Sequence, residues 1–107
     1  MLHESETIQA HINGLVDAEV RAYDTSLPVN QATLADFMRL RVRNPAKISV
    51  QFSGAIIQKC WTVTRSNGSY QVIYLPTADY FSLCVNSDFG PLDIGVHGSA
   101  LNCFASV

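Results

Sequence analysis

Residues 56–75 read IIQKCWTVTRSNGSYQVIYL, and this stretch decides the fold class. Two runs rich in β-branched and aromatic residues flank Asn67-Gly68, and Asn-Gly is the strongest short signal for a two-residue hairpin turn. Counting outward from that turn gives three cross-strand pairs on one face: Arg65 with Tyr70, Val63 with Val72, and Trp61 with Tyr74. We expect this face to be core and the opposite face to be of mixed character.

A period of two continues on both sides of this hairpin. It predicts about six antiparallel strands over residues 46–107, including strands near 48–52 and 80–85 and a final hairpin over 92–107. The final hairpin would turn at Gly98-Ser99, because glycine in the first position suits a type II′ turn. In that register the polar residues of the last two strands lie on the face opposite to the apolar one.

Before residue 46 the apolar residues follow helical spacing instead. They predict one helix from about Ser5 to Tyr23 and, after a break at Pro28, a second helix capped by Asn30 and ending near Leu40. The fold class is therefore α+β in a single domain of residues 1–107, with a helical layer over about 5–43 and a sheet over about 46–107. We expect the two helices to pack on one face of a single antiparallel meander.

This arrangement is similar in general shape to the cystatin-like and NTF2-like folds. The comparison is one of architecture, rests on no motif, and implies nothing about function.

Composition excludes several classes of protein. The 107 residues are 48% hydrophobic and 15% charged, which argues against a disordered chain. No apolar run reaches the roughly 18 residues of a transmembrane helix, so we expect no membrane contact. The polar, acidic first residues lack the pattern of a secretory signal, and we expect a cytoplasmic protein.

Charge is unevenly distributed along the chain. Residues 1–36 have a net charge of −5, residues 37–78 of +6, and residues 79–107 of −3. The basic middle, and residues 39–65 in particular, either forms an anion site or packs beside the acidic first helix so that the charges cancel; we favour cancellation. The overall isoelectric point of 5.8 argues against nucleic acid as a partner.

The cysteines give no sign of a metal site. Cys60, Cys84 and Cys103 are widely spaced, form no C-x-x-C pair and have no histidine at ligand spacing. We expect three partly buried free thiols, no metal and no cofactor.

Each predicted helix carries one charged residue in the middle of its apolar face. Glu19 falls about 20° from Ile8 on a helical wheel, between Ile8 and Ile12, and Arg41 falls between Leu34 and Phe37 if the second helix extends that far. A buried charge needs a partner, so we expect a Glu19–Arg41 ion pair. Two alternatives stay open. One or both side chains reach solvent near a helix end, or they form the polar floor of a pocket in which a carboxylate acts as general base.

Asp93, His97 and Asn102 share one face in the predicted register and could form an acid–base or ligand-binding group. Asp93 and His97 would lie about 13 Å apart on one strand, however, so we expect no direct contact and an exposed His97. Trp61 and Tyr74 are predicted as sheet core, with a stacking wall for a planar ligand as the alternative.

The high apolar content suggests contacts between subunits. We expect a homodimer formed through a sheet edge or through the face that carries Tyr80, Cys84, Ala100 and Phe104. Since no catalytic motif is found, the function predicted is that of a binding or interaction protein that acts as a homo-oligomer on a protein or small-molecule partner. The alternative is a small pocket enzyme or small-molecule-binding protein with a cavity between helices and sheet, lined by Glu19, Arg41, Trp61 and His97.

Overall fold

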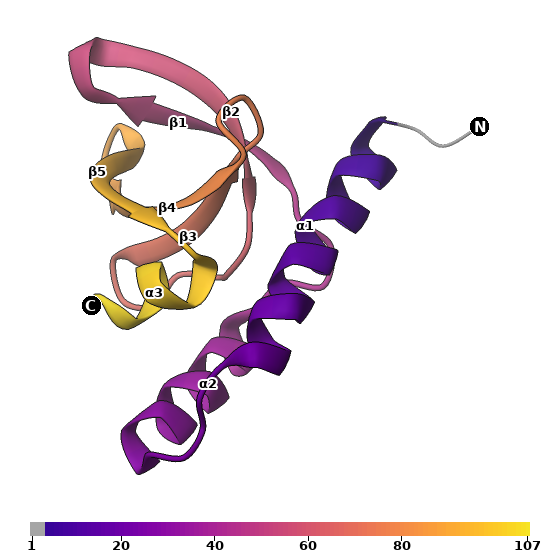
Figure 1. Ribbon diagram of the computed structural model, residues 1–107. Helices are drawn as coiled ribbons and strands as arrows, with labels where there is room; N and C mark the ends of the chain where they lie inside the picture. Colours follow the sequence, from indigo (N-terminus) through magenta and orange to yellow (C-terminus); the bar gives the residue numbers. More distant parts are fainter. Residues whose placement is uncertain (1–3) are drawn as a thin grey trace.

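The structure is a computed structural model that describes the backbone of residues 4–107 and the side chains from residue 7 onward. Three α-helices are present in this range: α1 (Glu4–Ala22), α2 (Pro28–Leu40) and α3 (Ala100–Ala105), together with a 3-10 helix, η1 (Ser53–Ala55). Five strands follow one another between α2 and α3: β1 (Lys47–Phe52), β2 (Ile56–Thr62), β3 (Tyr70–Leu75), β4 (Tyr80–Ser87) and β5 (Gly90–Gly98). Figure 1 shows the strands curled into a barrel, with α1 and α2 as a helical hairpin along one side of it.

The two N-terminal helices agree with the prediction from apolar spacing, but the start of α2 differs. Leu27 holds the N-cap position without a side-chain hydrogen bond, and Pro28 occupies the first turn. Proline suits that position because its missing N–H would have no partner there and its φ angle is already helical. The predicted cap at Asn30 is therefore wrong by about one turn.

The β2–β3 hairpin keeps the predicted register within its strands, but the predicted pair of Arg65 with Tyr70 is wrong, because Tyr70 pairs with Asn67 and Arg65 is exposed. Trp61 pairs with Tyr74, and Thr62 with Ile73, as the sequence indicates. The turn itself lies one residue later than predicted, at Gly68-Ser69, and Gly68 has a φ angle of 64°. The shift is absorbed by a bulge, since the backbone N–H groups of Val63 and Thr64 both donate to the Val72 carbonyl, at 3.0 and 3.3 Å.

The sheet closes into a barrel of five strands and is not an open meander of six. Each strand pairs with the next in antiparallel fashion, and β1 then pairs with β5 in parallel through Gln51 and Leu92. This parallel closure follows from the odd number of strands, because the first and last strands of an odd meander run in the same direction. The sheet is therefore mixed, and the overall class remains α+β.

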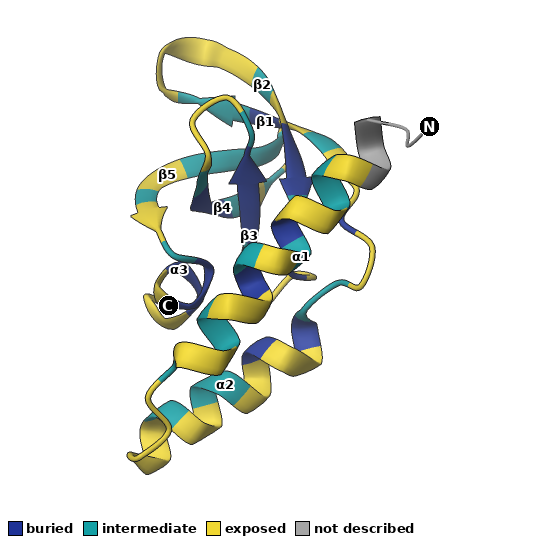
Figure 2. Ribbon diagram, turned by 45° about the vertical axis from the view of Figure 1, so that its right-hand side comes forward, coloured by how far each residue is buried: buried dark blue, intermediate teal, exposed yellow. Residues whose placement is uncertain are grey.

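Closure gives the sheet two separate apolar layers. Inside the barrel, alternate side chains form one buried cluster: Val50, Cys60, Ile73, Leu75 and Cys84. Outside it, the other side chains of β2, β3 and β4 pack beneath the helices in a larger cluster, which includes Trp61, Val72, Tyr74, Leu83, Ile12, Val16 and Phe37. Figure 2 shows the buried residues gathered where α1 and α2 meet these strands. The space between helices and sheet is thus filled by side chains.

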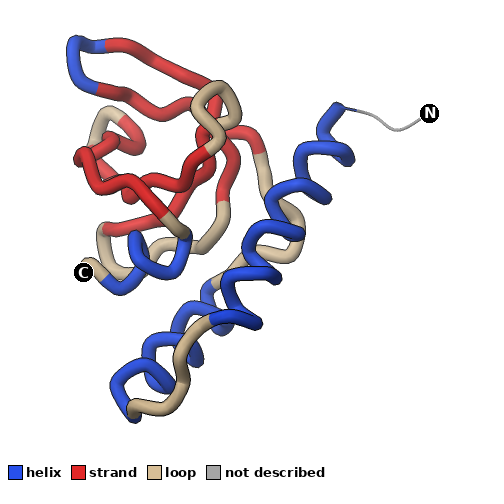
Figure 3. Tube along the Cα trace, viewed as in Figure 1, coloured by secondary structure: helices blue, strands red, loops and turns tan. Residues whose placement is uncertain are grey.

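The C-terminal segment forms helix α3 and not the predicted last strand (Figure 3). Ser99 caps the helix, its hydroxyl accepting the Asn102 N–H at 3.1 Å. The Glu19 carboxylate accepts the next two free donors, the N–H groups of Ala100 and Leu101, each at 3.0 Å. Short apolar runs do not separate strand from helix by their pattern alone, and here a side chain distant in sequence accepts the first N–H groups of the helix.

The face predicted for dimerisation is largely buried, two of its residues lying in α3 and two in β4 of the barrel. Ala100 and Cys84 are fully buried, Phe104 is 6% exposed, and Tyr80 packs against the inner cluster. Cys84, Ala100 and Phe104 therefore belong to the interior of one chain, and Tyr80 is partly buried. Within residues 4–107, no helix is both long enough and apolar enough to cross a bilayer.

Candidate functional site

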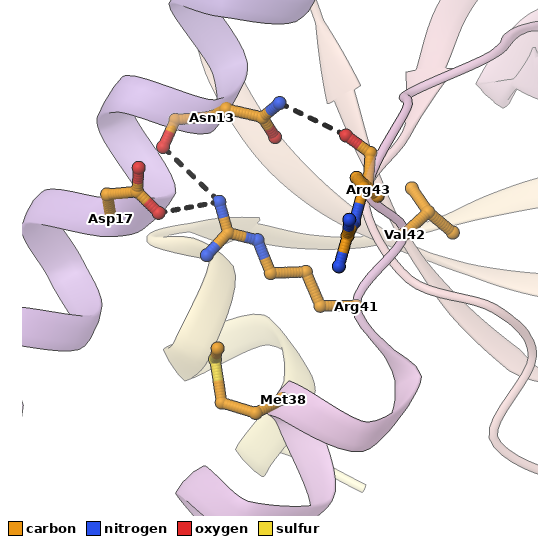
Figure 4. Close-up of a pocket in the computed structure, with 6 residues that line it drawn as sticks. All are labelled: Asn13, Asp17, Met38, Arg41, Val42 and Arg43. Atoms are coloured by element: carbon orange, nitrogen blue, oxygen red, sulfur yellow. Dashed lines mark hydrogen bonds and ion pairs between the residues drawn. The ribbon is translucent and has the colours of Figure 1, made fainter.

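Arg41 pairs with Asp17 and not with Glu19. Its backbone N–H closes α2 by donating to the Phe37 carbonyl at 2.8 Å, and its side chain turns toward α1. There the Nη2 atom lies 2.8 Å from Oδ1 of Asp17 and donates to the Asn13 carbonyl at 3.3 Å (Figure 4). The acidic first helix thus neutralises one arginine of the basic segment, through Asp17 and not through Glu19.

A cleft of about 330 Å³ opens beside this pair, between α1 and the chain that leaves α2. It is lined by Asn13, Asp17, Met38, Arg41, Val42 and Arg43, and we call it the Arg41 cleft. Its walls are tied together, because the Asn13 side-chain amide donates to the Arg43 carbonyl at 3.2 Å. One helical turn earlier, the Gln9 amide donates to the Pro45 carbonyl at 2.7 Å.

The two arginines of the Arg41 cleft differ in their hydrogen-bond and ion-pair partners. Arg41 has a side chain that is only 14% exposed, and both of its contacts use the Nη2 atom. Arg43 is exposed, and its guanidinium has no hydrogen bond or ion pair with any residue described. With Asp17 as the acidic group of the lining, the cleft has one positive charge in excess. Such a cleft can hold an anion.

A second cleft of about 320 Å³ lies where the first turns of α1 meet β1 and β2. Ile8, Trp61 and two lysines are among its lining residues, and we call it the Lys47 cleft. Lys47 places its Nζ atom 5.5 Å from the centre of the Trp61 ring, and Lys59 donates to the Ser49 hydroxyl at 2.7 Å. The lining contains no carboxylate among the residues described, so this cleft is also positive.

Glu19 has a structural position. Both of its carboxylate oxygens accept backbone N–H groups of α3, as given above, and the helix end provides the positive partner that a carboxylate prefers. The ion pair expected with Arg41 is not formed. The carboxylate reaches a third, shallow depression lined by Tyr23, Ser99 and Asn102 but is already occupied by the two N–H groups.

Trp61 and Tyr74 lie in the core, as the first interpretation of their positions predicts. They are 4% and 2% exposed. The Tyr74 hydroxyl donates to the Asp79 carboxylate, and burial together with this bond raises the pKa of Tyr74. His11 contacts the same carboxylate at 3.2 Å.

The Asp79 carboxylate makes the stability of the folded protein depend on pH in the acidic range. The Tyr74 hydroxyl, and to a smaller extent His11, hold the pKa of Asp79 below its ordinary value of 3.8. The stabilisation is therefore complete above that value and is lost as pH falls through the folded-state pKa. We expect Asp79→Asn to flatten the acid limb of the stability–pH curve below about pH 4. Urea titrations at several pH values test this, and a curve unchanged in Asp79→Asn contradicts it.

Asp93 and His97 are in contact, against the prediction from strand spacing. Leu83 pairs with Val96 while the adjacent Cys84 pairs with Asp93, so β5 has a bulge at this point. Gly95 adopts a φ angle of 78° within the bulge, which other residues rarely adopt. The strand is irregular there, and Nε2 of His97 lies 3.3 Å from the Asp93 carboxylate. In a regular strand the two residues would stand about 13 Å apart along the backbone, too far for this contact.

The Asp93 carboxylate has more hydrogen-bond partners than any other carboxylate of the barrel. Its side chain is 8% exposed and accepts hydrogen bonds from the buried Ser82 hydroxyl and from the Gly95 N–H, the latter at 3.2 Å. His97 stacks on Tyr80, with 4.4 Å between ring centroids. Asp93 thus lies between Ser82 and His97. In a nucleophilic triad the histidine contacts the serine, so this imidazole is not placed to accept the Ser82 proton. Asn102 lies on α3 and does not share a strand face with this group.

All three cysteines are free and buried, as expected. Burial, together with the nearby charge of Asp93, raises the pKa of Cys60 and Cys84 to about 12. Burial and the charge of Glu19 raise the pKa of Cys103 to about 11. Among the residues described, no group of histidine, cysteine and acidic side chains could hold a metal ion.

The buried thiols lead to a prediction about reactivity. Since the thiolate is the reactive form, we expect the native cysteines to react with an aromatic disulfide reagent about a hundredfold or more slowly than free cysteine at about pH 8. The unfolded chain in denaturant is the control and should react fully. One thiol that reacts rapidly in the native protein would show that its environment is more open than described.

The residues of the Arg41 cleft were missed by the sequence analysis, apart from Arg41 itself. A signal is present, because Gln9, Asn13 and Asp17 recur every four residues and therefore form a polar stripe along one side of α1. No protein-family model, curated protein or solved structure gave a significant match to this chain.

Proposed function

We propose that this protein is a non-enzymatic binding protein that holds an anionic group of a partner in the Arg41 cleft. The observation that carries the proposal is that the cleft contains one arginine held in place by other residues and a second arginine without a partner among the residues described. Asp17 and the Asn13 carbonyl hold the Arg41 guanidinium in place, and Arg43 stands beside it with no partner among the residues described. The binding group is thus partly ordered before any ligand arrives.

Arginine chemistry favours a carboxylate or a phosphate in this position. A guanidinium offers five N–H donors in a rigid plane, and the contacts of Arg41 use only its Nη2 atom. Met38, 45% exposed, lines the same cleft and gives the ligand an apolar surface to contact. A carboxylate next to an apolar group therefore fits the lining best.

The alternative of a pocket enzyme receives less support. Glu19 caps α3, Arg41 pairs with Asp17, Trp61 lies beneath Lys47, and His97 binds Asp93 on β5. These side chains do not converge, and the layer between helices and sheet where the pocket was expected is packed.

A homodimer and a cytoplasmic location stay predictions. The apolar side chains available for self-association differ from those first expected, and the most exposed ones of the barrel strands and their turns are Ile56, Ile57 and Phe89. The mass of the protein in solution at micromolar concentration tests the dimer.

A titration with N-acetyl-glutamyl-leucine tests the anion site, since this dipeptide carries carboxylates beside one apolar side chain. We expect backbone amide NMR shifts confined to residues 13–17 and 38–43, and an affinity about tenfold lower in Arg43→Gln, because a hydrogen bond to a charged group is worth about 1.5–3 kcal/mol. Arg39→Gln is the matched control, since Arg39 is exposed, pairs with Asp36 and lies outside the cleft. Equal affinity in wild type and Arg43→Gln would contradict the proposal.

A further inference from the structure

The Arg41 cleft and the Lys47 cleft lie at the two ends of one seam, where α1 packs beside residues 41–47. Asn13 and Asp17 line the first cleft, and Ile8, on the same helix, lines the second. Between them, the side chains of Gln9 and Asn13 fasten α1 to the carbonyls of Pro45 and Arg43. The two clefts are therefore held at a fixed separation.

The seam is basic along its length. Its cations are Arg41, Arg43, Lys47 and Lys59, which we call the basic seam. Among the residues described, Asp17 is the one acidic residue in the two linings, and it belongs to the Arg41 cleft. Exposed apolar side chains stand at both ends, Met38 at 45% and Ile57 at 67% exposure.

We propose that the basic seam binds an extended acidic segment of a partner polypeptide, with one acidic side chain in each cleft and an apolar side chain beside each. The inference rests on the proposed function of the Arg41 cleft and adds the Lys47 cleft to it. Ile8 and Asp17 are separated by about 13 Å along the helix at its usual rise. An extended chain covers that distance in about four residues, so the two acidic residues should stand about four positions apart.

Nucleic acid fits the seam less well than a polypeptide. Binding of single strands relies on exposed aromatic side chains on which bases stack. Trp61 is only 4% exposed, and the described linings of both clefts contain no other aromatic residue. The net charge of −2 also opposes a long polyanion.

The spacing gives a direct test with two peptides of equal composition. The capped peptide LEGSGEL has its glutamates four positions apart, whereas LEEGSGL has them adjacent. By fluorescence anisotropy with labelled peptides, we expect wild type to bind LEGSGEL about tenfold more tightly than LEEGSGL, because only the first peptide reaches both clefts. Lys59→Gln should remove this preference, whereas Arg43→Gln should weaken binding of both peptides and Arg39→Gln of neither.

The outcomes separate the seam from the function on which it rests. Equal binding of the two peptides, with loss in Arg43→Gln, overturns the seam and leaves the Arg41 cleft as an anion site. Binding that is the same in Arg43→Gln and wild type overturns both. Tighter binding of a thymidine oligonucleotide than of LEGSGEL overturns the assignment to a polypeptide. Unchanged melting temperatures of the variants ensure that each loss concerns binding.

Discussion

Replacement of Glu19 by alanine is expected to destabilise the protein by about 2–3 kcal/mol, which is among the largest effects of any single polar substitution in this chain. The carboxylate accepts the N–H groups of Ala100 and Leu101, and both of these residues are buried. Without it, two donors at the start of α3 lose their partners, and desolvation of each costs free energy that no other group returns. Urea denaturation measures the change.

Two comparisons make the Glu19 result specific. Glu19→Gln keeps one acceptor oxygen but presents an amide N–H₂ group to a backbone donor, so we expect about half of the loss. Asp36→Ala removes a carboxylate that is 61% exposed and paired with Arg39, and we expect a change below about 0.5 kcal/mol. A Glu19→Ala variant as stable as Asp36→Ala would show that α3 is held by its apolar contacts alone.

The second large effect is expected for Asp93→Ala, at about 2–4 kcal/mol. Its carboxylate accepts from Ser82, Gly95 and His97, and Ser82 is fully buried in the barrel. The substitution leaves that hydroxyl without an acceptor and releases the bulge that Gly95 forms. Chemical denaturation again provides the measurement, with Asp88→Ala, an exposed residue of the β4–β5 turn, as the matched control.

A second substitution tests the mechanism of this loss. If the unsatisfied Ser82 hydroxyl is a large part of the cost, Ser82→Ala combined with Asp93→Ala should be more stable than Asp93→Ala alone. A double variant in which the two losses simply add would contradict the direct coupling of these side chains.

Local patterns in the sequence predict much of the fold and little of the site. The helical spacing before residue 46 gives α1 and α2, because it depends on neighbouring residues. The Asn67-Gly68 signal gives the hairpin, and the predicted pairing of Trp61 with Tyr74 holds because a bulge offsets the one-residue error in the turn. Residues 100–105 form a helix whose first N–H groups bind a carboxylate about eighty positions earlier. Alternation alone is compatible with either a strand or a buried helix there.

The site depends on irregular backbone and on partners distant in sequence. Strand geometry placed Asp93 and His97 far apart, and a bulge around Gly95 brings them together. The helical wheel identified Arg41 as a charge in need of a partner, which it is. It did not identify Asp17, because the wheel describes one helix and the pair joins α1 to the end of α2.

A charge exchange at Arg43 tests most directly whether the Arg41 cleft is a binding site for an anionic partner. The measurement is the affinity of Arg43→Glu for LEGSGEL and for the two peptides LKGSGEL and LEGSGKL, in each of which one glutamate is replaced by lysine. We predict that the variant binds LEGSGEL at least about tenfold more weakly than wild type and recovers most of the lost affinity with one of the two exchanged peptides. An Arg43→Glu protein that binds LEGSGEL as tightly as wild type would contradict the account.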